Sequence, residues 1–292
     1  MEIYYFILYF FTYGFLGWCT EVAFAAVKQG KFVNRGFLNG PICPIYGVGV
    51  SVVVSFLAPL EGSLILLYAT STILVTFIEW LTGYLMDKIF HHKWWDYSSQ
   101  PLNIGGYVCL LFSLIWGVAC VAIVKVIHPL IYKGLSFIPV TLGIVIAVIL
   151  AAVLFADLYV TASGILKLNK RLDAMEKIAA ELREVSDKVG ENIYESVMDT
   201  LEFQEEKKKM LAAASSEFKE KLEAASELRE RIGAATEEQK ARIEELKKKY
   251  TELAGRSTKV SVRLMKAFPK MESRNHRELL DAMKLRLKRD RK

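Results

Sequence analysis

SLILLYATSTILVTFIEWLTGYLMDKIFHHKWWDYSSQPLNIGG, residues 63–106, is the stretch that decides the fold. Residues 63–86 are apolar apart from small polar side chains and one acid, Glu79, and they are long enough to cross a hydrocarbon core about 30 Å thick as a helix. A polar, aromatic loop follows before the next apolar run begins. The stretch therefore predicts a membrane-spanning helix that carries an acid, followed by a specialised loop.

Four further apolar runs pass the same length test, so the sequence predicts about five transmembrane helices. They are residues 3–27, 40–60, 104–127 and 137–166. The first run lacks the basic start and small-residue cleavage site of a signal peptide, so we expect it to be retained. The second begins at Gly40 and Pro41, and Pro44 still falls in its first turn, where a missing N–H costs nothing.

Charge is distributed unevenly along the 292 residues. Residues 1–166 hold seven Lys or Arg and seven Asp or Glu, whereas the remainder holds 31 and 25. This predicts an all-α polytopic membrane protein with two domains: a transmembrane domain, 1–166, and a cytoplasmic, charged helical tail, 167–292.

The tail begins with an apolar seam that alternates spacings of four and three, which is typical of a coiled coil. The seam consists of Leu168, Leu172, Met175, Ala179, Leu182, Val189 and Ile193, with an interruption at Ser186. Helical patterning continues to Gly255. An antiparallel hairpin and an extended, self-associating stalk both fit this pattern.

The last 37 residues, 256–292, contain thirteen bases and four acids. Such a segment can bind the anionic inner leaflet, so membrane lipid is an expected partner, although a solvated helix face is the alternative. Aromatic residues are nearly absent from it, which argues against nucleic acid as a partner.

Basic residues also predict the orientation in the cell membrane. They follow the first run (Lys28, Lys31, Arg35), the third (Lys88, Lys93) and the fifth (from Lys167 onward). These three regions should therefore be cytoplasmic, with the N-terminus outside and the tail inside.

Three acids, Glu21, Glu79 and Asp157, fall towards the cytoplasmic ends of predicted helices. An ionised side chain inside a bilayer costs at least about 2.5 to 3.5 kcal/mol, so each acid needs a partner, water or a proton, and Arg35 is the best partner. Burial without function is the alternative. We predict a cytoplasm-facing polar site made of Glu21, Arg35, Asn39, Glu79, Asp96, Asn103 and Asp157.

The third predicted helix, which begins at residue 63, is polar along one face. It carries Thr72, Thr76, Glu79, Gly83 and Asp87 at steps of three and four. Small residues let helices approach closely, so this face should meet the others around the acids. No metal or cofactor is expected, because His91 and His92 lack a third ligand at helical spacing and the four cysteines form no CxxC pair.

In the loop after helix three, Trp94, Trp95 and Tyr97 are expected at the headgroup level as an aromatic belt. Asp96 and Ser98 could cap a turn. The belt does not explain Pro101, Asn103, Gly105 and Gly106, which favour a re-entrant or tightly folded plug.

Four motifs occur in order: RGFLNGPICPIYG (35–47), EWLTGYLMD (79–87), WWDYSSQPLNIGGYVCL (94–110) and AFPKMESRNH (267–276). Together they resemble the bacterial ABC-transporter permease family of type IV. The resemblance implies a polytopic membrane permease of unestablished substrate that works with a separate ATPase. The motif residues to which we assign structural roles are Gly36, Gly40, Pro41, Pro44, Tyr46, Gly47, Gly83, Trp95, Tyr97, Ser98, Pro101 and Gly105.

Three functions compete, and we predict the first of them, a transport subunit. A transport subunit would use the polar site as a vestibule gated by the WWDYS loop, whereas a membrane scaffold or sensor would use the tail to recruit a partner or another copy. An intramembrane enzyme is the weakest, because no nucleophile and base stand at recognisable spacing. A GxxxxGK[ST] loop is absent, so the chain is not the ATPase itself.

Overall fold

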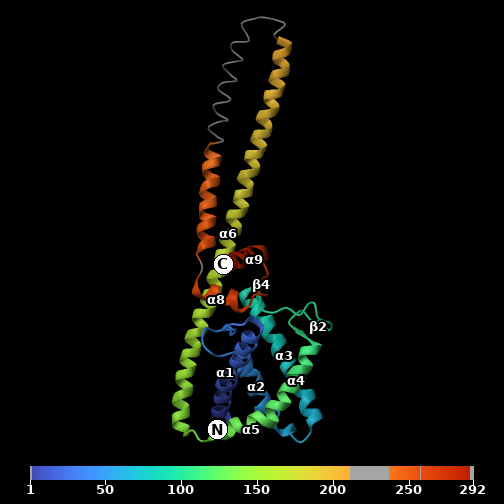
Figure 1. The fold of residues 1–292 in the computed structure, drawn as a ribbon, viewed down its shortest axis with the longest axis vertical. Helices are drawn as coiled ribbons and strands as arrows, with labels where there is room; N and C mark the ends of the chain where they lie inside the picture. Colours follow the sequence, from blue (N-terminus) through green and yellow to red (C-terminus); the bar gives the residue numbers. More distant parts are fainter. Residues whose placement is uncertain (1, 211–236, 257, 290–292) are drawn as a thin grey trace. The chain divides into compact units, whose positions relative to one another are not determined.

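The computed structural model describes residues 2–210, 237–256 and 258–289 (Figure 1). It divides into two compact units. The first joins Met1–Lys170 to Ser257–Lys292, and the second is Arg171–Arg256. The chain therefore leaves the first unit after the last apolar run and returns to it near its end.

Four helices of the described residues are long and apolar enough to cross a membrane. Two are α1 (Glu2–Gln29) and α3 (Leu64–Phe90). The next runs without a break through α4 (Leu110–Ala122), the π-helical η2 (Ile123–Ile127) and α5 (His128–Ser136), and Pro129 accounts for the irregular turn before it. The last lies in α6 (Val140–Met210). Four predicted spans are thus present.

The second predicted span differs. Its helix, α2 (Pro44–Phe56), has 13 residues and rises only about 20 Å, and the 3₁₀ turn η1 (Ala58–Leu60) follows. The ring of a proline disfavours helical geometry in the residue before it. Cys43, which precedes Pro44, accordingly has φ −112° and ψ 98°. The N–H of Cys43 donates to the carbonyl of Gly14 at 2.9 Å, so α2 begins halfway along α1.

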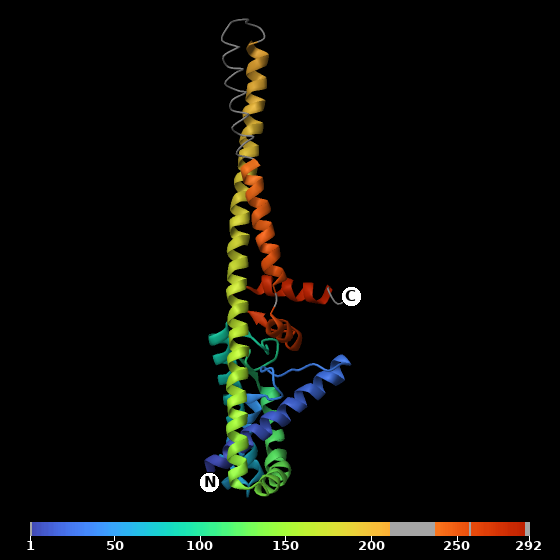
Figure 2. The ribbon, with the colours of Figure 1, turned by 90° about the vertical axis from the view of Figure 1, so that its left-hand side faces the viewer.

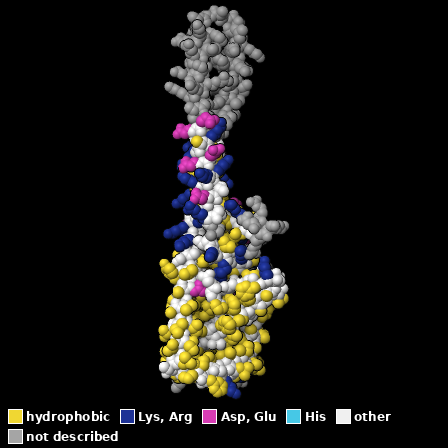
Figure 3. Space-filling view, turned by 60° about the vertical axis from the view of Figure 1, so that its left-hand side comes forward, with side chains coloured by type: hydrophobic (Ala, Val, Ile, Leu, Met, Phe, Trp, Pro, Cys, Tyr) yellow, Lys and Arg dark blue, Asp and Glu magenta, His cyan; other side chains and the backbone are white. Residues whose placement is uncertain are grey.

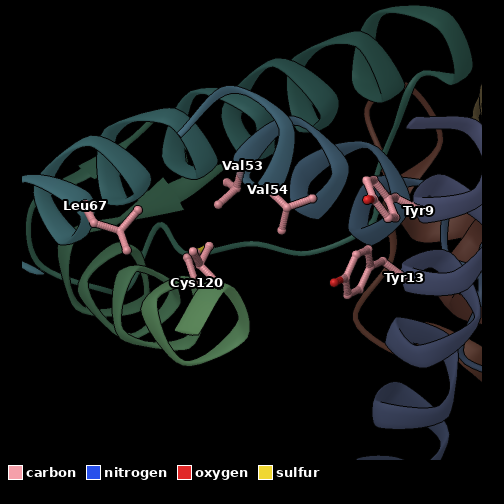
Figure 4. Packing of buried hydrophobic residues seen from close by; sticks show 7 residues of the cluster. Tyr9, Tyr13, Val53, Val54, Leu67 and Cys120 are labelled. Atoms are coloured by element: carbon pink, nitrogen blue, oxygen red, sulfur yellow. The ribbon is translucent and has the colours of Figure 1, made fainter. Parts of the chain in front are cut away.

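The core of the bundle lies at the end of α2 that is far from this start. Tyr9 and Tyr13 of α1, Val53 and Val54 of α2, Leu67 of α3 and Cys120 of α4 point towards one another there (Figure 4). Elsewhere the bundle is apolar on its outside: on the face drawn in Figure 3, hydrophobic side chains cover the transmembrane helices almost continuously. Lipid-facing surface of this kind fits the multi-pass membrane protein that the sequence predicts.

Short strands close one end of the bundle. β2 (Asn103–Ile104) pairs antiparallel with β3 (Val108–Cys109), so the fourth span begins at Leu110 and not at residue 104. Residues 258–289, with which the chain returns to the first unit, are called the returning segment. β1 (His92–Lys93) pairs antiparallel with β4 (Glu272–Ser273) of the returning segment, with His92 opposite Ser273. Helices α8 (Lys259–Ala267) and α9 (Arg277–Arg289) flank β4.

The second unit consists of the later part of α6 and a helix over residues 237–255, which runs beside it in the opposite direction (Figures 1 and 2). Arg242 forms an ion pair with Glu181 across the two helices, and Leu172, Met175 and Leu246 are buried. This arrangement fits the hairpin alternative. Val189 and Ile193 of the predicted seam lie outside the residues whose side chains are described, and the coiled coil stays a prediction.

Candidate polar site

A non-helical segment, residues 30–43, joins α1 to α2 and carries two residues of the predicted site, Arg35 and Asn39. Asn34 organises it: its Oδ1 accepts from the indole of Trp18 at 2.8 Å and from the N–H of Gly36 at 3.1 Å, while its Nδ2 donates to the carbonyl of Asn39 at 2.8 Å. These bonds satisfy polar groups that the missing helix would leave free. The segment is therefore ordered without regular secondary structure.

Arg35 pairs with Glu21, as expected of the best available partner. Arg35 Nε lies 3.3 Å from Glu21 Oε2, and about a quarter of each side chain stays accessible. Tyr46, in the first turn of α2, donates its hydroxyl to Glu21 Oε1 at 2.8 Å. The guanidinium also lies over the ring of Phe24, 5.3 Å from its centroid. An acid, a base and a phenol thus meet where α2 begins.

Asp157 of α6 holds the same segment from the other side. Its Oδ1 accepts from the N–H and the Nδ2 of Asn39, at 3.1 and 2.7 Å, and its Oδ2 accepts from the N–H of Gly40 at 2.6 Å. Thr161 donates to Oδ1 at 3.2 Å. With four donors the carboxylate is satisfied, so Asp157 anchors the segment and is not left free for a ligand.

Glu79 forms no ion pair with any of the residues that the structure describes. In the described part of the chain its Oε2 is buried without a hydrogen-bond partner, and Arg35 has Glu21 as its acid. Among the described residues, Arg35 therefore pairs with Glu21 and not with Glu79.

Asp96 and Asn103 have a different role, because they bond within their own loop. Asp96 Oδ1 accepts from the N–H of Ser98 at 3.0 Å and from the Ser98 hydroxyl, so the two cap a turn. Burial raises the pKa of Asp96, but the bonds from Ser98 outweigh it and leave the pKa below its usual range. Asn103 donates to the carbonyls of Ser98 and Gln100 and accepts from the N–H of Gly106. Both residues shape the loop.

The same loop is folded tightly around its glycines and aromatics. The indole of Trp95 donates to the carbonyl of Tyr107 at 2.7 Å, and Tyr97 stacks on Phe112. Gly105 and Gly106 have φ of +64° and +76°, which L side chains rarely adopt. Pro101 lies in an exposed turn of the loop. The sequence favoured either a re-entrant or a tightly folded plug for this loop, and these features match the tightly folded one.

Trp94 departs from the expected aromatic belt. Only 4% of it is exposed, because its ring sits edge-on between Phe37 and Phe268. Trp94 therefore packs against protein side chains and does not face lipid.

Close approach explains the remaining motif glycines. A Cβ on Gly47 would lie 2.6 Å from the carbonyl oxygen of Phe10, and one on Gly83 would lie 2.9 Å from the ring of Tyr107. Gly36 and Gly40 are tighter than ordinary contact against Trp18 and Asp157 respectively. Pro41 lies in the segment that leads to α2, and Pro44 begins the helix.

Two arginines of the returning segment contact this region, and the sequence analysis assigned neither. Arg263 of α8 donates to the carbonyls of Gly36 and Phe37 at 2.8 and 2.7 Å, immediately beside Arg35. Burial lowers the pKa of Arg263, while Asp157 acts in the opposite direction. The apolar spacing of Leu264 and Met265 around Arg263, which marks an amphipathic helix, was the available signal.

Arg274 forms the second contact of the returning segment, an ion pair with Asp87. Its Nη2 lies 2.7 Å from Oδ2 of Asp87, which is fully buried, and the hydroxyl of Tyr107 donates to the same oxygen at 2.6 Å. Burial, followed by this bond to Asp87, raises the pKa of Tyr107 to about 12. Arg274 N–H also donates to the carbonyl of His91. Residues 36–37, 87–94 and 263–274 therefore share one face of the first unit.

The profile of the family described as "Putative ABC-transporter type IV" matches residues 8–162, which is more than half of the chain and contains Glu21, Arg35, Glu79 and Asp157. No curated protein and no solved structure matches. Within the residues that the structure describes, no group of three or more His, Cys, Asp or Glu could hold a metal ion.

Proposed function

We propose that this chain, which belongs to the family described as "Putative ABC-transporter type IV", is a membrane transport subunit with a polar site that faces the cytoplasm. The site centres on Glu21, Arg35 and Tyr46, and its substrate is a small polar or charged solute. The observation that carries the proposal is the start of α2 halfway along α1, beside this ion pair.

Irregular backbone at membrane depth supports transport for a physical reason. Unpaired N–H and C=O groups are tolerated in a bilayer only where protein buries them or where they line a water-filled cavity. Transporters build their binding sites from such interrupted helices, because the free helix end and exposed carbonyls can contact a solute. The segment 30–43 followed by a 13-residue helix is an interruption of this kind.

The partial exposure of the ion pair supports the same reading. A charged pair that water can reach can exchange its internal partner for a charged group on a solute at modest cost, whereas a fully buried pair cannot. Glu79 would add a second carboxyl, which has no ion-pair partner among the described residues.

The orientation of the chain in the membrane is also part of the proposal. The face that contains residues 36–37, 87–94 and 263–274 would be cytoplasmic, because Lys28, Lys31, Lys88 and Lys93 flank it. Glu61 and Lys133 would be external.

Cysteine labelling tests the site and its orientation together. In a chain whose four cysteines are replaced by alanine, Arg35→Cys should react with a membrane-impermeant maleimide in inside-out vesicles only. Glu61→Cys, which is exposed at the opposite end of the bundle, is the matched control and should react in right-side-out vesicles only. Labelling of Arg35→Cys from the outside would overturn the cytoplasm-facing site.

A membrane scaffold or sensor is the second candidate, favoured by the second unit, a helical hairpin of its own that could recruit a partner. Purification from native membranes in mild detergent separates the two. Stoichiometric recovery of an ATP-hydrolysing subunit is expected for transport. Recovery of the chain alone, or with a cell-envelope protein that has no ATPase activity, would favour the scaffold.

A further inference from the structure

Helix α8 carries a basic face that forms no ion pair with an acid among the described residues. Lys259, Arg263 and Lys266 stand at steps of four and three, so they share one side of the helix, and with Val262 they line a shallow pocket. The opposite side, with Ser261, Leu264 and Met265, is buried.

The three bases differ from most of their neighbours in having no ion-pair partner among the described residues. Arg274, Arg277 and Lys284 are paired with Asp87, Glu272 and Asp281. Arg263 instead donates to two neutral carbonyls, which hold its guanidinium in place, and Asp157 offsets only part of its charge because it forms no ion pair with it. The pocket is therefore a fixed concentration of positive charge that an anion would stabilise.

The position of α8 indicates which kind of anion the pocket binds. Val260 of α8 lies against Gly164, where an added Cβ would come within 2.6 Å of it, and Gly164 stands at the end of the apolar run 137–166. Tyr159 and Leu166 of the same run expose large apolar surface, 75% and 48%. The basic face thus lies where hydrocarbon gives way to water, which is the level of lipid phosphates.

We propose that the pocket of Lys259, Arg263 and Lys266 binds the phosphate of an anionic phospholipid from the adjoining leaflet. Lys259 and Lys266, which are exposed, donate to the phosphate oxygens, and the acyl chains lie along the apolar surface of α6. Because Arg263 also holds Gly36 and Phe37, a bound lipid stabilises the segment that carries Arg35. This site does not depend on the transport proposal.

The test uses the full chain, delipidated in mild detergent and titrated with phosphatidylglycerol, phosphatidylcholine or inorganic phosphate while native mass spectrometry counts bound molecules. Wild type should retain phosphatidylglycerol in preference to phosphatidylcholine. Lys259→Gln with Lys266→Gln should raise the phosphatidylglycerol concentration needed by about tenfold or more. Lys259→Arg with Lys266→Arg should restore binding.

Lys270→Gln with Arg286→Gln is the matched control, because it removes two exposed charges of the same segment outside the pocket. It should bind as wild type does. Equal weakening by both Gln pairs would overturn the proposal in favour of a diffuse charge effect. Equal retention of phosphatidylcholine, or phosphate binding without any preference for phosphatidylglycerol, would overturn the lipid assignment.

Discussion

Arg35 has its acid partner in Glu21, and this pair can be measured. We expect Glu21→Gln and Arg35→Gln to be non-additive, with a coupling of about 0.5 to 1 kcal/mol, because the pair is close but partly exposed. Thermal unfolding in detergent of both single variants and the double variant gives the coupling.

Glu79→Gln provides the control for this cycle, since Glu79 has no ion pair with Arg35 in the described residues. Combined with Arg35→Gln it should be additive within about 0.5 kcal/mol. Strong coupling to Glu79 together with additivity at Glu21 would mean that the assigned partner is the wrong acid.

His92 should make the docking of the returning segment sensitive to pH. The residue is fully buried opposite Ser273, and burial lowers its pKa, with His91, Lys284 and His276 acting in the same direction and the bond to the His91 carbonyl opposing. His92 then binds a proton at a higher pH when the returning segment is undocked than when it is docked. Docking stability is thus complete above about pH 6.5 and declines as the pH falls towards the lower folded pKa.

Hydrogen exchange of residues 269–276, corrected for intrinsic rates, measures this effect. We expect protection at pH 7.5 to exceed protection at pH 5.5. His92→Gln should flatten the difference, whereas His91→Gln, at an exposed position, should preserve it. A pH dependence that survives His92→Gln would assign the effect to another group.

At the scale of elements, the ion pair of Arg274 with Asp87 fastens the returning strand β4 to α3. Among the described residues, Arg274→Gln leaves the buried carboxylate of Asp87 with the Tyr107 hydroxyl as its one partner. We expect a loss of about 1 to 3 kcal/mol, reduced from a fully buried pair because 47% of the Arg274 side chain is exposed. Thermal unfolding measures the loss.

Two further variants make this test specific. Asp87→Asn with Arg274→Gln should be less destabilising than Arg274→Gln alone, because no unpaired charge remains. Arg277→Gln removes an exposed pair with Glu272 and should cost less than about 0.5 kcal/mol. Equal losses for Arg274→Gln and Arg277→Gln would show that burial of Asp87 does not matter.

The elements also show what a sequence can predict. Four spans follow from apolar length alone, and the acids and the arginine of the site from their cost in a bilayer. The length test failed to define α2, because residues 40–43 are as apolar as a helix while Pro44 and its extended predecessor delay the helix start. The partners Asn39 and Asp157 are 118 residues apart, and no local pattern encodes such a contact.

At the scale of the whole chain, the returning segment carries the greatest surprise. Its charge made it look like a solvated or lipid-bound tail end, yet Leu264, Met271 and Leu280 are fully buried in the first unit. Single apolar residues scattered among thirteen bases give a weak hydrophobic signal. The strand pairing of Ser273 with His92 joins residues that are far apart in the sequence. Composition therefore describes the segment poorly.

This division of the chain predicts how fragments behave. Residues 171–256 form the second unit, so they should be soluble and strongly helical by circular dichroism and monodisperse in light scattering. Residues 167–292 carry the returning segment without its binding surface, and exposed Leu264, Met271 and Leu280 should make that fragment bind a hydrophobic dye and aggregate. Replacing these three residues by serine in the longer fragment should restore solubility. A longer fragment that is as soluble and as dye-free as the shorter one would mean that residues 257–292 fold without the transmembrane helices.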